Sequence, residues 1–307
     1  MQSPGSGGTR GRGGRRGCWT GPVVVVERVQ GLAERQRQEV AALERRVVAA
    51  DGGRLKLEHD VLASRPGDRV LDLLVHEGGA LVGFLGLYPF GRASVELAGM
   101  VDPGHRRRGV ATALLDAATP LVREWPRVLL VVPGGSAAGH ALARRRGGVP
   151  HHAEHALVLD GPPAEGPADP ALALRPAGPA DAAVVARLLA AAFDEGAPDE
   201  AALAAQLASP AERTLLVEHR GAPVGTLRLT SYEGTGGVYG FAVDPGRQGR
   251  GIGRDALRRA CALLRAEGAR RVALEVAVGN DRALGLYTSL GFRPVAREDY
   301  YALPVPA

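Results

Sequence analysis

Residues 243–253 have the sequence Val-Asp-Pro-Gly-Arg-Gln-Gly-Arg-Gly-Ile-Gly, and residues 101–111 have the related sequence Val-Asp-Pro-Gly-His-Arg-Arg-Arg-Gly-Val-Ala. Further matches share the same offset along the chain: Val82-Gly83 with Val224-Gly225, and Gly109 with Gly251. A motif that recurs at one fixed offset indicates an internal duplication. We therefore expect two copies of one domain in this chain of 307 residues, which is about twice the usual domain length.

A proline-rich segment separates the two copies. Residues 160–170 contain Pro162, Pro163, Pro167 and Pro170. Because proline fixes φ and has no backbone N–H to donate, such a segment is typical of a semi-rigid linker. We predict an N-terminal domain over residues 22–160, a linker over 161–170 and a C-terminal domain over 171–307. Residues 1–21 are rich in Gly and Arg and contain no acid, so we predict a disordered tail.

Both copies show one order of expected elements. In the second copy we predict a strand over 171–175 and helices over 181–192 and 199–208. Strands over 213–219, 223–230 and 237–243 follow, then a helix over 254–268, a strand over 271–278, a helix over 281–290 and a closing hairpin over 294–303. In the first copy the strands are expected over 70–76, 80–88, 94–101 and 127–132, and the helices over 110–124 and 137–146. This order predicts an α+β fold with a mixed, mainly antiparallel, twisted sheet flanked by helices.

Composition excludes several classes of protein. Hydrophobic residues make up 45% of the chain and charged residues 23%, which is typical of a globular protein, and no apolar run approaches the ~18–20 residues of a membrane span. Four arginines of the tail supply most of the net charge of +5, so we expect at most a weak contact of the tail with nucleic acid. Two cysteines, Cys18 and Cys261, form no disulfide framework, and we expect a reduced, cytoplasmic protein. The spacing of His140, His151, His152 and His155 matches no metal-ligand pattern, so no metal is expected.

The glycine-rich loop at residues 248–253 has the features of an anion site. It lies between an expected strand and the start of an expected helix. Glycines let backbone N–H groups approach a ligand closely, and a helix N-terminus adds unsatisfied donors. Arg250 and Arg254 can neutralise further phosphate charge.

The loop and its surroundings resemble the Gcn5-related N-acetyltransferase (GNAT) superfamily. The family pattern Gln/Arg-x-x-Gly-x-Gly/Ala is present as Gln248, Gly251 and Gly253, and again as Arg106, Gly109 and Ala111. The resemblance implies that acetyl-CoA is the cosubstrate, with its pantetheine beside the preceding strand and its pyrophosphate on the loop. The implied binding residues are Phe241, Ala242, Val243, Gln248, Gly249, Arg250, Gly251, Ile252, Gly253 and Arg254. A Rossmann site does not fit, because its glycines follow the first strand of the unit and these follow the fourth.

A second motif indicates where the chemistry takes place. Leu274-Glu275-Val276, Asn280 and Leu286-Tyr287, followed by Leu290-Gly291-Phe292, resemble the ribosomal-protein alanine acetyltransferases. By that resemblance Glu275 is the general base, acting through water, and Tyr287 is the acid that protonates the CoA thiolate. We expect the two side chains to converge across one cleft. Asn280 either contributes to the cofactor site or caps its helix, and Glu233 is a second candidate base.

The first copy departs from this pattern. Arg144 takes the position of Tyr287, and arginine cannot donate a proton at neutral pH. Glu96 remains a candidate base there, but we predict that the first copy is catalytically degenerate. Whether it binds acetyl-CoA stays open.

Three functions therefore compete. The leading one is acetyl transfer to a primary amine of a peptide or small molecule, in the second copy. The layout of a degenerate first and an active second domain also resembles the mycothiol synthase family, which acetylates a cysteinyl pseudodisaccharide. In that family a glutamate opens the strand before Val-Asp-Pro, and here Gly237 stands in its place. The third alternative is a non-catalytic acetyl-CoA-binding regulator. The acidic residues Asp194, Glu195, Asp199 and Glu200 either attract a cationic amine or begin a helix.

Overall fold

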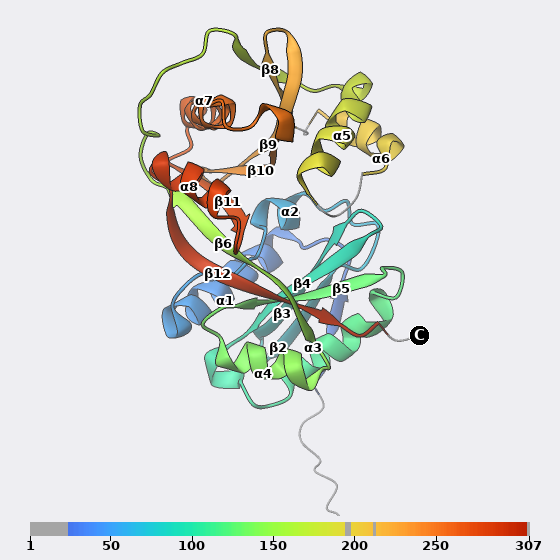
Figure 1. Ribbon diagram of the computed structural model, residues 1–307. Helices are drawn as coiled ribbons and strands as arrows, with labels where there is room; N and C mark the ends of the chain where they lie inside the picture. Colours follow the sequence, from blue (N-terminus) through green and yellow to red (C-terminus); the bar gives the residue numbers. More distant parts are fainter. Residues whose placement is uncertain (1–23, 194–197, 211–212, 306–307) are drawn as a thin grey trace, which may run out of the picture.

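One sheet runs through the whole molecule. The computed structural model describes residues 24–193, 198–210 and 213–305. Within these ranges the chain forms a 12-stranded sheet in the order β1-β2-β3-β4-β5-β12-β6-β11-β10-β9-β8-β7. Figure 1 shows two lobes, with the first copy below and the second above, joined by the long strands β6 and β12.

The two copies contain the same series of elements. The first comprises β1 (Glu27–Val29), α1 (Glu34–Asp51), α2 (His59–Ser64), β2 (Asp72–Glu77), β3 (Ala80–Phe90), β4 (Ser94–Val101), α3 (Val110–Ala118), β5 (Arg127–Pro133), α4 (Ala137–Arg145) and β6 (Val149–Leu159). The second comprises β7 (Leu172–Pro176), α5 (Ala182–Ala192), α6 (Glu200–Leu207), β8 (Thr214–His219), β9 (Ala222–Tyr232), β10 (Thr235–Val243), α7 (Ile252–Ala266), β11 (Arg271–Ala277), α8 (Asp281–Ser289) and β12 (Arg293–Leu303). Among the described strands β4 and β5 pair in parallel, as do β10 and β11, and the other neighbours are antiparallel. The predicted α+β class with a mixed, mainly antiparallel sheet is confirmed.

The last strands of the two copies are exchanged. β12 lies between β5 and β6 and pairs with both, and β6 pairs on its other side with β11. The predicted closing hairpin over 294–303 is therefore wrong: the segment is one continuous strand, because its partners are β5 and β6 and not its own neighbouring residues. The proline-rich segment after β6 is held on α7, where Arg258 Nη2 donates to Pro167 O (2.7 Å) and Arg259 Nη2 donates to Asp169 O (2.8 Å).

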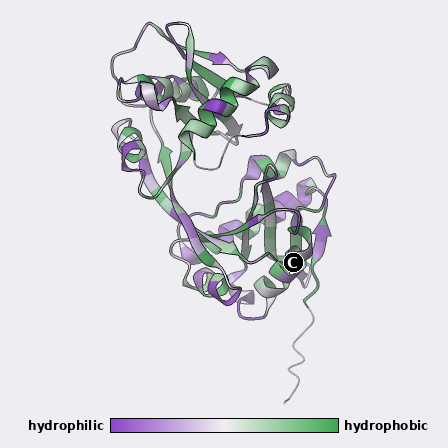
Figure 2. Ribbon diagram, turned by 45° about the vertical axis from the view of Figure 1, so that its right-hand side comes forward, coloured by the Kyte–Doolittle hydropathy of each residue, from purple (hydrophilic) through white to green (hydrophobic). Residues whose placement is uncertain are grey.

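Helices cover both faces of the sheet in each lobe. In the first copy α1 buries Val40, Leu43 and Val47 on one face, and α3 buries Val110, Leu114 and Leu115 on the other. In the second copy α5 and α6 cover the face that corresponds to α1, and α7 and α8 cover the opposite face. In Figure 2 the strands are mostly hydrophobic, and hydrophilic residues gather on the helices and loops. None of the described helices is both long enough and apolar enough to cross a membrane.

Candidate active site

The glycine-rich loop of the second copy is exposed at the start of α7. Gly249 (φ 78°) and Gly251 (φ 81°) adopt the left-handed conformation that side chains disfavour, and Gly251 is the N-cap of α7. The loop residues 246–251 are exposed, so the first N–H groups of α7 face an open surface. Arg254 is also exposed and makes no hydrogen bond or ion pair with the described residues. This geometry suits a phosphate group.

A second arginine lies beside the loop. Gln248 Nε2 donates to Val243 O (2.9 Å), which fixes the loop on β10, and Gln248 Oε1 accepts from Arg282 Nη1 (2.7 Å). Arg282 is at the start of α8, and it was not predicted from the sequence because it lies outside both motifs. Asn280 caps this helix, with Oδ1 accepting from Ala283 N (3.1 Å).

β10 and β11 separate beyond their first paired residues. Their parallel pairing extends from Thr235 to Gly237 of β10, and β10 then has a bulge between Tyr239 and Ala242. Gly240 in this bulge has φ 55° and is exposed. A bulge redirects the backbone of a strand, and such features are frequent beside active sites. Phe241 lies within the bulge and Val243 follows it, and a Cβ built on Gly253 would lie 3.7 and 3.6 Å from their side chains. The residues predicted for pantetheine and pyrophosphate are therefore brought together.

Tyr287 is buried on the face of the sheet covered by α7 and α8. Its side chain is 7% exposed and belongs to the hydrophobic core that includes Leu274 and Val276 of β11. Its hydroxyl makes no hydrogen bond to a described residue. Burial raises the pKa of Tyr287 to about 12, so that the phenol keeps its proton at neutral pH.

Glu275 lies on the opposite face of the sheet. Successive side chains of a strand point to opposite faces, so that Leu274 and Val276 face α7 and Glu275 faces the first copy. Its carboxylate accepts from Arg54 Nη2 (2.7 Å) and forms an ion pair with Lys56 Nζ (2.8 Å). Burial raises the pKa of Glu275, but the charges of Lys56 and Arg54 outweigh burial and lower it. The expected convergence of Glu275 and Tyr287 in one cleft is not seen, because the sheet lies between them.

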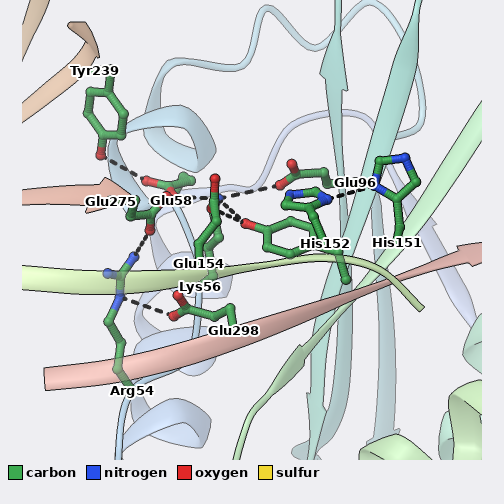
Figure 3. A network of polar contacts seen from close by, with 11 residues as sticks. Arg54, Lys56, Glu58, Glu96, His151, His152, Glu154, Tyr239, Glu275 and Glu298 are labelled. Atoms are coloured by element: carbon green, nitrogen blue, oxygen red, sulfur yellow. Dashed lines mark hydrogen bonds and ion pairs between the residues drawn. The ribbon is translucent and has the colours of Figure 1, made fainter. Parts of the chain in front are cut away.

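Lys56 is the centre of a charged cluster between the two copies, which Figure 3 shows. It is the one lysine of the chain. Its Nζ donates to Tyr300 OH (2.5 Å) and forms ion pairs with Glu154 (3.3 Å) and Glu96 (3.7 Å). We call the following residues the Lys56 network: Arg54, Lys56, Glu58, Glu96, Glu154, Tyr239, Glu275, Glu298 and Tyr300. Of these residues only Glu96 and Glu275 were predicted from the sequence as candidate site residues, because the others are scattered over elements whose contacts depend on the strand exchange.

Other candidates lie elsewhere. Glu233 is in the exposed turn between β9 and β10. Asp199 caps α6, its Oδ1 accepting from Ala202 N (2.7 Å), whereas Asp194 and Glu195, like residues 1–21, fall outside the described residues. His140 contacts Tyr301 OH (2.9 Å), and His151 contacts His152. In the described ranges no group of three or more His, Cys, Asp or Glu residues is placed to hold a metal ion.

The first copy differs at the corresponding positions. Its loop arginine, Arg106, is held by Asp51 through two hydrogen bonds of 2.8 and 2.7 Å. The register of β4 against β3 runs without a bulge from Ser94 to Val101. Arg144, which replaces Tyr287, is at the end of α4.

Comparison with known proteins identifies the family. The family model "Acetyltransferase (GNAT) family" matches residues 39–157 and 183–292, one match in each copy. The chain belongs to the GNAT acetyltransferase family. It is 37% identical over 284 residues to a mycothiol acetyltransferase of Kineococcus radiotolerans, covering 86% of this chain and 91% of that protein. A mycothiol acetyltransferase of Beutenbergia cavernae is 33% identical over 292 residues, covering 86% and 95%.

Two solved structures share the fold of this GNAT protein over nearly its whole length. A GCN5-related N-acetyltransferase from Sphaerobacter thermophilus aligns with a TM-score of 0.74 at 19% identity, over 92% of this chain and 96% of that one. A tandem GNAT protein of the clavulanic acid biosynthesis pathway aligns with a TM-score of 0.63 at 22% identity, over 92% and 99%. At this identity the likeness shows the fold alone.

Proposed function

We propose that the protein acetylates the amine of a cysteinyl amino-sugar, the reaction of the mycothiol synthase family, with acetyl-CoA as the donor. The observation that carries this proposal is the similarity to relatives named mycothiol acetyltransferase over nearly their whole length. These relatives favour the narrower alternative over the general amine acetyltransferase that the sequence analysis preferred. Gly237 remains a departure from the family pattern.

The second copy carries out the chemistry in this proposal. The loop 248–253, with Arg254 and Arg282, binds the pyrophosphate, and the separated part of β10 from Phe241 to Val243 lies along the pantetheine. Tyr287 gives its proton to the leaving thiolate, and its raised pKa keeps that proton available. The first copy, with its bulge-free β4 and Arg144, supplies structure and side chains to the second.

Release of CoA thiol from acetyl-CoA tests the proposal. We expect release with a cysteinyl glucosamine acceptor at a rate well above that with polyamines, aminoglycosides or N-terminal peptides. Tyr287→Phe should lower kcat by about 10²-fold, the usual contribution of a general acid. Tyr232→Phe, at the last residue of β9, is the matched control and should keep the wild-type rate. If acetyl-CoA binds and no acceptor supports release, the protein is a non-catalytic binder.

A further inference from the structure

The amine that attacks acetyl-CoA must first lose a proton, and we propose that Glu58 of the first copy is the general base of the second. This inference rests on the proposed function. The active site would then contain residues of both copies, with the acid from the second copy and the base from the first.

Strand β4 of the first copy carries the carboxylate of Glu96, but the corresponding strand of the second copy, β10, carries no carboxylate. Glu96 of β4 lies opposite Tyr88 of β3, and Gly237 of β10 lies opposite Thr230 of β9. These two pairs occupy the same place in the duplicated sheets, so Gly237 stands where the first copy has Glu96. A Cβ built on Gly237 would lie 2.5 Å from Thr230 Oγ1 and 2.5 Å from the ring of Tyr239. Tyr239 therefore fills the space that a side chain at position 237 would need.

Glu275 is poorly suited to accept a proton. Two cations hold its carboxylate, at 2.7 Å from Arg54 and 2.8 Å from Lys56, and its pKa is lowered. A carboxylate that is stabilised as the anion is a weak base. Its contacts indicate a positioning role, since Glu275 holds the segment 54–58 against β11.

Glu58 lies at the start of α2, in the segment that the first copy extends toward β10. Its Oε2 accepts a hydrogen bond from Tyr239 OH (3.2 Å), as Figure 3 shows. Tyr239 is the one hydrogen-bond partner of the Glu58 side chain among the described residues. Each of the other four glutamates of the Lys56 network has an ion-pair partner within 4.0 Å, and Glu58 has none in the described part of the chain. The side chain is half-buried next to the bulge of β10, where the two strands separate.

The surroundings of Glu58 favour its neutral form. The charged and titratable groups that face it come from several elements: Arg54 and Lys56 of its own segment, His59 and Asp60 of α2, Tyr88 of β3, Glu96 of β4, Tyr239 of β10 and Glu275 of β11. Burial and the charge of Glu275 raise the pKa of Glu58, and the charges of Lys56 and Arg54 oppose them. A carboxylate whose pKa is raised is a stronger base than an ordinary carboxylate, so it takes a proton from an ammonium group more readily.

The ammonium of the acceptor gives one proton to the Glu58 carboxylate, and the freed lone pair forms the C–N bond with the thioester carbon. As the C–S bond breaks, its electron pair goes to sulfur, which takes the proton of Tyr287. The nitrogen loses a second proton through water to the Tyr287 phenolate, and Glu58 returns its proton to solvent. The products are the amide, CoA thiol and one proton.

The test compares kcat/KM of the full-length protein and of Glu58→Gln over pH, with cysteinyl glucosamine as the acceptor and release of CoA thiol as the readout. At pH 7 we expect Glu58→Gln to lose about 10²-fold, the usual contribution of a general base. Near pH 9.5 the loss should be about tenfold smaller than at pH 7, because roughly a tenth of an α-amine with a pKa of about 8 is neutral at pH 7 and nearly all of it is neutral at pH 9.5. Asp60→Asn is the matched control, two residues away with the same change of charge, and should stay within about threefold of wild type.

Each other outcome contradicts the proposal in a distinct way. A Glu58→Gln rate within threefold of wild type at pH 7, or a loss that is the same at both pH values, excludes Glu58 as the base. A pH-dependent loss in Glu275→Gln alone assigns the base to Glu275. If the Glu58→Gln protein does not bind acetyl-CoA, or if its melting temperature is well below that of the wild type, Glu58→Asp is tested instead. Its rate should lie between those of the wild type and Glu58→Gln. A wild-type protein that releases no CoA with any amine disproves the proposed function, and the role of Glu58 with it.

Discussion

Glu298 on β12 is the most deeply buried carboxylate of the Lys56 network. Its side chain is 0% exposed, its oxygens have no hydrogen-bond partner, and its nearest cation, Arg54 Nε, is 3.9 Å away. Burial raises the pKa of Glu298 to about 7, well above the value of about 4.3 in an unfolded chain. Between these two values the unfolded state has released its proton and the folded state has not. The free energy of unfolding therefore falls as pH rises through this window.

We predict that Glu298→Gln increases the free energy of unfolding at pH 8 by about 2 kcal/mol, because the amide avoids a buried charge. At pH 5, where Glu298 is already neutral, the gain should disappear. Urea unfolding at both pH values measures this difference. Glu165→Gln, an exposed position of the proline-rich segment, is the control and should change neither value. A Glu298→Gln protein that is less stable at both pH values would show that the carboxylate is needed as an anion.

At the scale of single elements, α3 and α7 provide a matched pair. Each begins after a glycine N-cap in the left-handed conformation, Gly109 (φ 86°) and Gly251 (φ 81°), and neither position has a neighbour within 4 Å of an added Cβ. Alanine therefore imposes a similar backbone strain of about 1 kcal/mol at both.

We predict that Gly251→Ala lowers kcat/KM for acetyl-CoA about tenfold, because it displaces N–H groups that face the pyrophosphate. Gly109→Ala should lower stability to a similar extent and leave kcat/KM unchanged, because in the proposed mechanism the reacting acetyl-CoA binds to the loop of the second copy and not to the loop that contains Gly109. Steady-state CoA release at varied acetyl-CoA measures both. Equal losses in the two variants would mean that both loops serve catalysis.

Some elements were predictable from the sequence, whereas the pairing of others was not. Strand β4 begins and ends where the sequence predicts, and the loop at 248–253 and Tyr287 are recognisable because their motifs are local. The partners of β6 and β12 were not predictable, since the alternation of side chains along a strand specifies its faces and not its neighbour. Glu58 and Lys56 were missed for the same reason: they reach β10 and β11 only through contacts far apart in the sequence.

At the scale of the whole molecule, the strand exchange makes each copy depend on the other. In the first copy β12 separates β5 from β6, and in the second copy β6 separates β11 from β12. If the chain is divided in the proline-rich segment, the first fragment lacks β12 and the second fragment lacks β6. Backbone N–H and C=O groups of the strands that pair with them are then left unpaired. The Lys56 network crosses the same boundary, so a separated half also carries charged groups without their partners.

We therefore predict that residues 1–165 and 166–307, made separately, aggregate or stay unfolded, and that together they form a 1:1 complex. The complex should recover CoA release, because the cut lies in the segment after β6 and breaks no strand. Size-exclusion chromatography and the release assay follow both properties. A cut in the exposed turn at Glu233-Gly234 is the control: its fragments should reassociate poorly, since the first pairs of β10 with β9 and β11 adjoin that turn. A monomeric, active fragment 166–307 would contradict the interdependence of the copies, and would require a base for acetyl transfer other than Glu58.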